Sequence, residues 1–136
     1  MIFSKKSNDK NTDLIKVAAL LIHAAKIDEN YSDQEEKIIN KTLLELGAKR
    51  ENLENIMINA KKIEDDANQI LDFTREIKNM NQENKIKIIE SLWQIIYSNQ
   101  EADIYETGLM RRLAGLLYID NKTMGDIKER IKKENT

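Results

Sequence analysis

The sequence predicts an all-α fold, a single compact bundle of about seven helices, and three observations lead to it. The chain of 136 residues contains no proline and only 4 glycines, so it lacks the residues that most often interrupt helices. Apolar residues recur at the three- and four-residue spacing of a helix along almost the whole chain. The apolar pattern of the first half also repeats in the second half. A chain of this length forms one domain with a real hydrophobic core.

Three helices are expected in the first half. The first, over about 13–27, places its apolar side chains on one stripe. The second, over 33–46, is followed by Gly47, where a left-handed C-terminal cap is expected. The third, over about 50–63, again has apolar residues on one face. Residues 1–11, which precede the first helix and are mostly polar, predict a disordered or frayed N-terminal segment.

Four helices are expected in the rest of the chain. A linking helix over about 65–80 begins with an acidic run, which is typical of a first helical turn. Helices over 82–97 and 104–118 follow, each with a continuous apolar stripe. The last begins after Asn121.

A shift of 71 residues superimposes the two halves of the sequence. It brings together apolar positions that are expected to be buried, namely Leu21 with Leu92, Ile22 with Trp93, Ala25 with Ile96, Ile38 with Leu109, Ile39 with Met110 and Leu46 with Leu117. Loop lengths are kept across three helices, which chance similarity between amphipathic helices would not preserve. We therefore expect two pseudo-repeated three-helix units, about 12–63 and 83–133, joined by the central helix within one domain of about 12–133.

The two connections between the first and second helix of each unit are acidic, and helix capping explains part of each. Ser32 with Glu35, and Asp103 with Glu106, have the spacing of a capping box. In this motif the N-cap oxygen accepts from the backbone three residues on, and the acidic side chain reaches back to the N-cap amide. Such a cap stabilises a helix by about 1 kcal/mol. Capping leaves Asp28 unexplained, because this residue precedes the cap.

A hard-cation site is the alternative interpretation of the first acidic turn. Calcium and magnesium bind oxygen ligands that come from short loops, and polar residues alternate from Asp28 to Ser32 as in the start of an EF-hand loop. The match ends there, because Asp33 stands where that loop needs glycine and Ile39 where it needs glutamate. A different geometry remains open, in which Asp28 and Glu35 converge across the turn.

Four segments carry a resemblance to a known family. They read AAKIDENYSDQEEKII, ILDFTREI, IIESLWQIIY and YSNQEADIYETGLMRRLAGLL. The first and last resemble the two acidic signatures of the tellurite-resistance TerB-like family, in which Ala-x-x-Asp-Gly precedes a glutamate at the start of the next helix. The middle two resemble its linking segment and fifth helix. The resemblance covers about Leu14 to Ile131 and implies an all-helical bundle with an acidic surface.

The resemblance also implies metal-site residues. The first site would use Asp28 and Glu35, and the second would use Asn99, Asp103 and Glu106, with calcium as the expected cation. The sequence departs from the family at the second site, because Asn99 stands where aspartate is usual and therefore attracts a cation less strongly. Glycine, usual after the first acidic position of each signature, is replaced by glutamate in the first and by glutamine in the second.

The family resemblance favours a binding module over an enzyme. The chain has no cysteine, a single histidine, no Gly-rich phosphate loop and no nucleophile motif. Residues 11–121 contain 14 basic and 20 acidic residues, which argues against nucleic-acid binding. No run approaches the roughly 18 apolar residues of a membrane span, so a cytoplasmic location without direct membrane insertion is expected.

The expected function is a non-enzymatic module that binds a divalent cation weakly and takes part in a tellurite-type stress response. The resemblance implies another protein as its partner, membrane-associated in some members of the family. The alternative is a metal-independent helical scaffold for protein–protein interaction. Two further expectations concern single residues. His23 is expected at the boundary of the core, and Glu90 is expected to pair with Arg75 or Arg112.

Overall fold

A computed structural model describes residues 2–26, 32–66, 70–98 and 104–134, with side chains described from residue 12 and, in the sixth helix, from residue 108. In this part of the chain all regular structure is helical, which confirms the predicted all-α fold. The elements are α1 Ile2–Lys26, α2 Asp33–Glu45, the 3₁₀ turn η1 Arg50–Asn52, α3 Leu53–Asp66, α4 Leu71–Ile77, α5 Gln82–Tyr97, α6 Ile104–Leu116 and α7 Asn121–Glu134.

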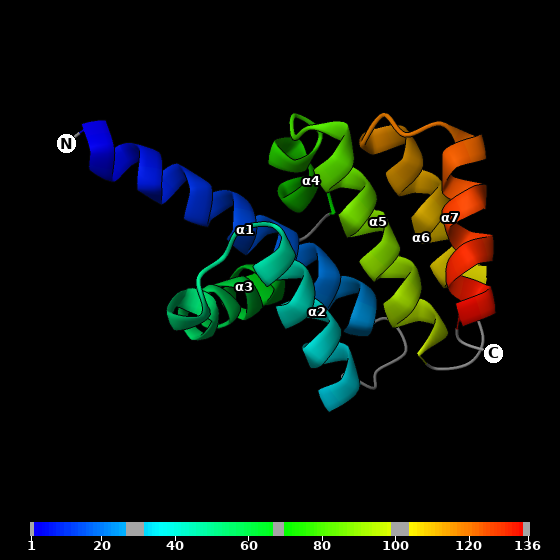
Figure 1. The fold of residues 1–136 in the computed structure, drawn as a ribbon, viewed down its shortest axis with the longest axis horizontal. Helices are drawn as coiled ribbons and strands as arrows, with labels where there is room; N and C mark the ends of the chain where they lie inside the picture. Colours follow the sequence, from blue (N-terminus) through cyan, green and yellow to red (C-terminus); the bar gives the residue numbers. More distant parts are fainter. Residues whose placement is uncertain (1, 27–31, 67–69, 99–103, 135–136) are drawn as a thin grey trace.

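The helices are arranged around α1 and α5, which lie next to each other in the middle of the bundle (Figure 1). Helices α2, α3 and α4 pack against the C-terminal half of α1, while α6 and α7 lie on the far side of α5 (Figure 1). The N-terminal turns of α1 extend beyond the other helices (Figure 1). None of the described helices is long and apolar enough to cross a membrane.

The C-terminal half of α1 is buried on nearly all sides rather than along one stripe. Val17 to Leu21 are all 0% exposed, although Ala19 and Leu20 lie off the predicted apolar stripe. The reason is that α1 contacts α2, α3, α4 and α5 at once. A helix surrounded in this way is apolar around its whole circumference. The small side chains Ala18 and Ala19 allow these neighbours to approach closely.

Helix α1 also begins earlier than the apolar pattern indicates. It starts at Ile2, well before the predicted start at residue 13. The segment contains neither proline nor glycine, so nothing in the sequence stops the helix from extending toward the N-terminus once its buried half is formed.

The predicted boundary between the third and fourth helices is wrong. Glu64 and its two acidic neighbours were expected to begin the fourth helix, but they form the last turn of α3. Helix α4 is accordingly short, Leu71–Ile77 rather than about 65–80. Carboxylates at a helix C-terminus oppose the helix dipole. Here Lys26 offsets that cost, because its Nζ lies 2.6 Å from Glu64 Oε1 and 3.0 Å from Asp65 Oδ1.

The C-terminal ends of α2 and α6 are built alike. Gly47 has φ 107°, which confirms the predicted left-handed cap, and the amide of the next residue, Ala48, donates to Leu43 O at 2.9 Å. Tyr118, 71 residues later, has φ 58°, and Ile119 N donates in the same way to Ala114 O at 2.9 Å. The ends of α2 and α6 also differ by 71 residues. The pseudo-repeat of two three-helix units is consistent with these ends and stays a prediction.

Candidate functional site

The turn between α1 and α2 is the candidate site predicted from the sequence, and its C-terminal edge is described. Ser32 is the N-cap of α2, and the capping box is present. Ser32 N donates to Glu35 Oε1 at 2.8 Å, and Glu35 N donates to Ser32 Oγ at 3.2 Å. The predicted capping role of both residues is therefore confirmed. Asp28 lies outside the described residues.

Glu35 is buried far more deeply than capping requires. Its relative exposure is 0%, whereas Asp33 in the same helical turn is exposed. Carboxylates are almost never fully buried unless they are paired, because the ionised group loses its hydration. A signal for this burial is present in the sequence: Ile39 and Leu43 follow Glu35 at intervals of four residues and are buried as well. Glu35 therefore belongs to the core-facing stripe of α2.

The second predicted site cannot be compared in the same way. Asn99 and Asp103 lie outside the described residues, and the side chain of Glu106 does too. The second capping box and the second cation site therefore stay predictions. Within the described part of the chain, no three His, Cys, Asp or Glu side chains are grouped so that they could hold a metal ion together.

A small ionic cluster lies at the end of α1, immediately before the candidate turn. Lys26 bridges to Glu64 and Asp65 of α3, and His23 Nδ1 lies 3.3 Å from Glu64 Oε2. The hydrogen bond to Glu64, and then that to Asp65, raises the pKa of Lys26. His23 is 38% exposed along its side chain, which confirms its expected place at the boundary of the core. The cluster fixes the end of α1 against the end of α3.

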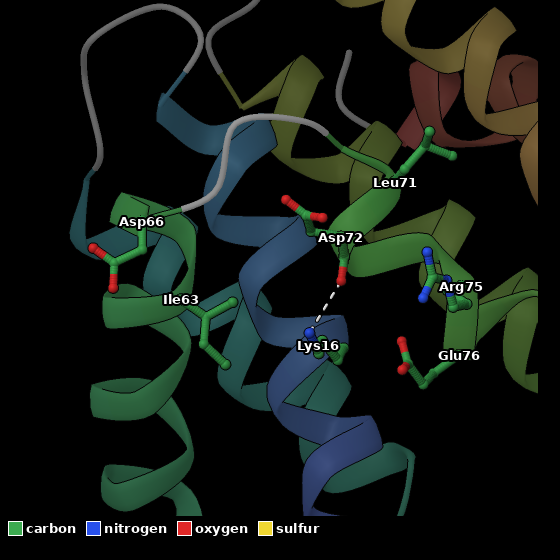
Figure 2. Close-up of a pocket in the computed structure, with 7 residues that line it drawn as sticks. All are labelled: Lys16, Ile63, Asp66, Leu71, Asp72, Arg75 and Glu76. Carbon is green, nitrogen blue, oxygen red and sulfur yellow. Dashed lines mark hydrogen bonds between the residues drawn. The ribbon is translucent and has the colours of Figure 1, made fainter.

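A polar cleft of about 320 Å³ opens between α1, α3 and α4 (Figure 2). Five charged side chains line it, namely Lys16, Asp66, Asp72, Arg75 and Glu76. Lys16 Nζ donates to the backbone oxygen of Asp72 at 3.1 Å, and the Glu76 carboxylate points toward the space between the side chains of Lys16 and Arg75 (Figure 2). No ion pair joins these five side chains. The mixture of charges selects neither an anion nor a cation, so the cleft does not define a chemistry by itself.

The prediction that Glu90 pairs with Arg75 or Arg112 is wrong. Glu90 pairs with Arg130 of α7, whose Nη1 lies 2.9 Å from Glu90 Oε2, rather than with Arg75 or Arg112. Glu90 keeps 27% of its side chain exposed, so the pair lies at the surface between α5 and α7. Arg130 lies in the last helix, and its spacing from Glu90 gave no local sequence signal for the pair.

Comparison with known protein families gives a match over most of the chain. The model of the family described as tellurite resistance protein TerB matches residues 14–129, which is most of the chain. Neither a curated protein nor a solved structure matches the chain.

Proposed function

The chain belongs to the tellurite resistance protein TerB family, and from this premise we propose that it is a non-enzymatic binding module that holds a divalent cation weakly at the turn between α1 and α2. Asp28 and Glu35 are the proposed ligands. Asn99, Asp103 and Glu106 are the proposed ligands of a second and weaker site. Calcium is the proposed cation.

The burial of Glu35 is the observation that supports this proposal most. A carboxylate offers about four lone-pair positions, and the hydrogen bond from Ser32 N uses one of them on Oε1. Capping and cation binding are therefore compatible in one side chain. A hard cation next to a buried carboxylate would offset the loss of its hydration. The exposed first-turn acid Asp33 has no such need.

The lysine that precedes the turn is held by carboxylates of another helix. Lys26, the nearest described cation toward the N-terminus, has its ammonium group bound to Glu64 and Asp65 of α3. The two carboxylates of Asp28 and Glu35 supply few negative charges for a calcium site. We therefore propose a dissociation constant at the weak end of the range for protein calcium sites, about 0.1–1 mM.

Titration with calcium, followed by NMR on the full chain, tests the proposal. The resonances of Asp28 and Glu35 should shift in a saturable way, and magnesium and manganese serve as competitors. Glu35→Gln is the sharpest variant, because glutamine at this position can still complete a capping box but carries no charge. It should lose the saturable shift and keep the fold.

Asp33→Asn is the matched control, because it removes one carboxylate from the same helical turn at an exposed position. It should leave the calcium response nearly unchanged. Shifts that are linear in calcium, or equal losses in Asp33→Asn and Glu35→Gln, would show only general attraction to acidic surface and would refute the site. Asn99→Asp should strengthen a second set of shifts, because it restores the missing charge.

The cellular role that we propose is a stress response of the tellurite type, through a cation-dependent contact with another protein. In a pull-down from cell extract, the protein should capture its partner in the presence of calcium and release it when chelator is added. The Glu35→Gln variant should capture less of the partner. Capture that survives both chelator and Asp28→Asn would instead support a metal-independent scaffold.

A further inference from the structure

A second cleft, far in the sequence from the turn between α1 and α2, lies where α5, α6 and α7 meet. It has a volume of about 140 Å³ and is named the basic slot here. Its apolar wall consists of Trp93 of α5, Met110 and Ala114 of α6 and Met124 of α7. An apolar cavity of about 150 Å³ holds one benzene molecule, so the slot has room for one apolar side chain. Methionines suit such a wall, because they adapt to the shape of what enters.

The charge of the basic slot is of one sign. Arg111 and Lys128 line it, and no carboxylate is among its lining residues. Two other clefts differ from it, since the cleft of Figure 2 combines two basic and three acidic residues, and a cleft between α2, α5 and α7 combines three of each. On a chain of net charge −2, a cleft whose charged lining residues are all cations is selective for anionic groups.

Neither cation of the slot is neutralised by a described residue. No ion pair is formed by Arg111 or Lys128 with the rest of the described chain, and Lys128 Nζ lies 5.4 Å from the centre of the Trp93 ring. This cation–π contact holds the ammonium group beside the apolar wall. The Trp93 side chain is another unsatisfied group, because its buried indole N–H has no hydrogen-bond partner among the described residues. Buried indole N–H groups usually have one.

Gly125 leaves the slot open on the α7 side. It is one of the lining residues, and a Cβ added there would meet no atom within 4 Å. Glycine inside a helix costs about 1 kcal/mol relative to alanine. Gly108 and Gly115 are equally unobstructed, so glycine alone does not mark a site. What distinguishes Gly125 is its position in the wall of a cleft, where any side chain would occupy the space.

We propose that the basic slot binds an acidic peptide segment of a partner protein. One apolar side chain of that segment enters between Trp93 and the methionines, and flanking carboxylates pair with Arg111 and Lys128. The proposal follows from charge complementarity and from the size of the slot. It does not depend on the first proposed cation site, because the slot is built by α5, α6 and α7 and that site by the turn between α1 and α2.

Trp93 provides the assay, since it is the one tryptophan of the chain. The probe is the peptide acetyl-Asp-Glu-Phe-Glu-Asp-amide, titrated into the full chain in the presence of chelator while tryptophan emission is recorded. We expect a saturable change. Replacing the phenylalanine of the peptide with alanine, or its acids with lysine, should abolish the change. An equal response to the lysine peptide would overturn the proposal.

Two variants separate the slot from general electrostatics. The double variant Arg111→Gln with Lys128→Gln should weaken binding about tenfold, as expected for one exposed and one half-buried charge. The matched control, Lys49→Gln with Arg50→Gln, removes the same charge from exposed residues at η1 and should leave binding nearly unchanged. Equal weakening in both would refute the slot, because it would show attraction to net charge alone.

A steric variant tests the apolar part of the proposal. Gly125→Leu places a side chain in open space beside the wall and should abolish the fluorescence response without unfolding the protein. Gly108→Leu is its control, because Gly108 also lies in an unobstructed helical position but does not line the slot. Unchanged binding in a folded Gly125→Leu variant would overturn the proposed binding mode. Loss of the calcium response with intact peptide binding would affect the proposed function alone.

Discussion

Replacing Glu35 with alanine is the most informative single change, because it separates the two roles that this side chain combines. The variant loses the hydrogen bond from Ser32 N to Glu35 Oε1, which is 2.8 Å long. Loss of a capping hydrogen bond costs about 1 kcal/mol. It also removes a side chain that is 0% exposed, and the space left behind adds a further cost of about 1–2 kcal/mol. We therefore expect a loss of about 2–3 kcal/mol.

Glu35→Gln is the comparison that isolates charge from shape. Glutamine fills nearly the same space, and its amide oxygen can accept from Ser32 N. It carries no charge, so this variant changes the electrostatics and keeps the shape. Without calcium, we expect Glu35→Gln to be as stable as the natural chain within about 0.5 kcal/mol, because the capping hydrogen bond is kept.

Thermal and urea denaturation followed by circular dichroism measure both variants. For a chain of this size, 1 kcal/mol corresponds to about 3–5 °C in Tm, so Glu35→Ala should melt about 6–15 °C lower. Calcium adds a second readout, because a ligand at ten times its dissociation constant stabilises the folded state by about 1.4 kcal/mol. The natural chain should show this gain and Glu35→Gln should not. A Glu35→Ala variant that melts within 2 °C of the natural chain would refute the reasoning about burial and capping.

Four further substitutions concern helix ends and the core. Gly47→Ala should destabilise the fold by about 1 kcal/mol, because φ 107° is costly for any residue with a Cβ. Tyr118→Gly should stabilise the fold by a similar amount, because glycine adopts φ 58° without that cost. Urea denaturation measures both changes. Leu43→Ala, at a position 0% exposed, should cost about 2–5 kcal/mol in the same assay, and a smaller loss would contradict its place in the core. The hydrogen bond from Thr123 lowers the pKa of Asp120 below its ordinary 3.8, so its stabilising effect is present above pH 3.8 and is lost as pH falls through the lowered pKa. The difference in Tm between the natural chain and the Asp120→Asn variant, measured from pH 7 down to pH 2, should therefore become smaller at acidic pH. A difference that stays constant would exclude this role.

The helices and several of their ends could be predicted from local sequence. The apolar period gives α2 and α7 because each buries one face. Ser32 and Gly47 mark the two ends of α2 through backbone hydrogen bonds that reach only a few residues. Such signals are local, so a single sequence contains them.

The end of α3 could not be predicted in this way. The acidic residues Glu64 and Asp65 look like a helix start, and their position in a last turn depends on Lys26, which is distant in the sequence and close in space. The same holds for Glu90, whose partner Arg130 comes from another helix. For the candidate site, the capping role of Glu35 follows from spacing, whereas its full burial depends on the packing of α2 onto the bundle.

The basic slot could not be predicted from the sequence for a different reason, because its apolar wall belongs to the stripes that build the core. The 71-residue shift nevertheless shows where the two halves differ. It pairs Ala114 with Leu43, a larger side chain that is 0% exposed, and Lys128 with Met57, which is 5% exposed. It also pairs Gly125 with Glu54. At these positions the second half has a smaller side chain in place of leucine, no side chain in place of glutamate, and a cation in place of a buried methionine. Under the predicted pseudo-repeat, a loss of volume and an added cation are the differences that a charged cleft requires, whereas the apolar period that both halves share predicts only the bundle.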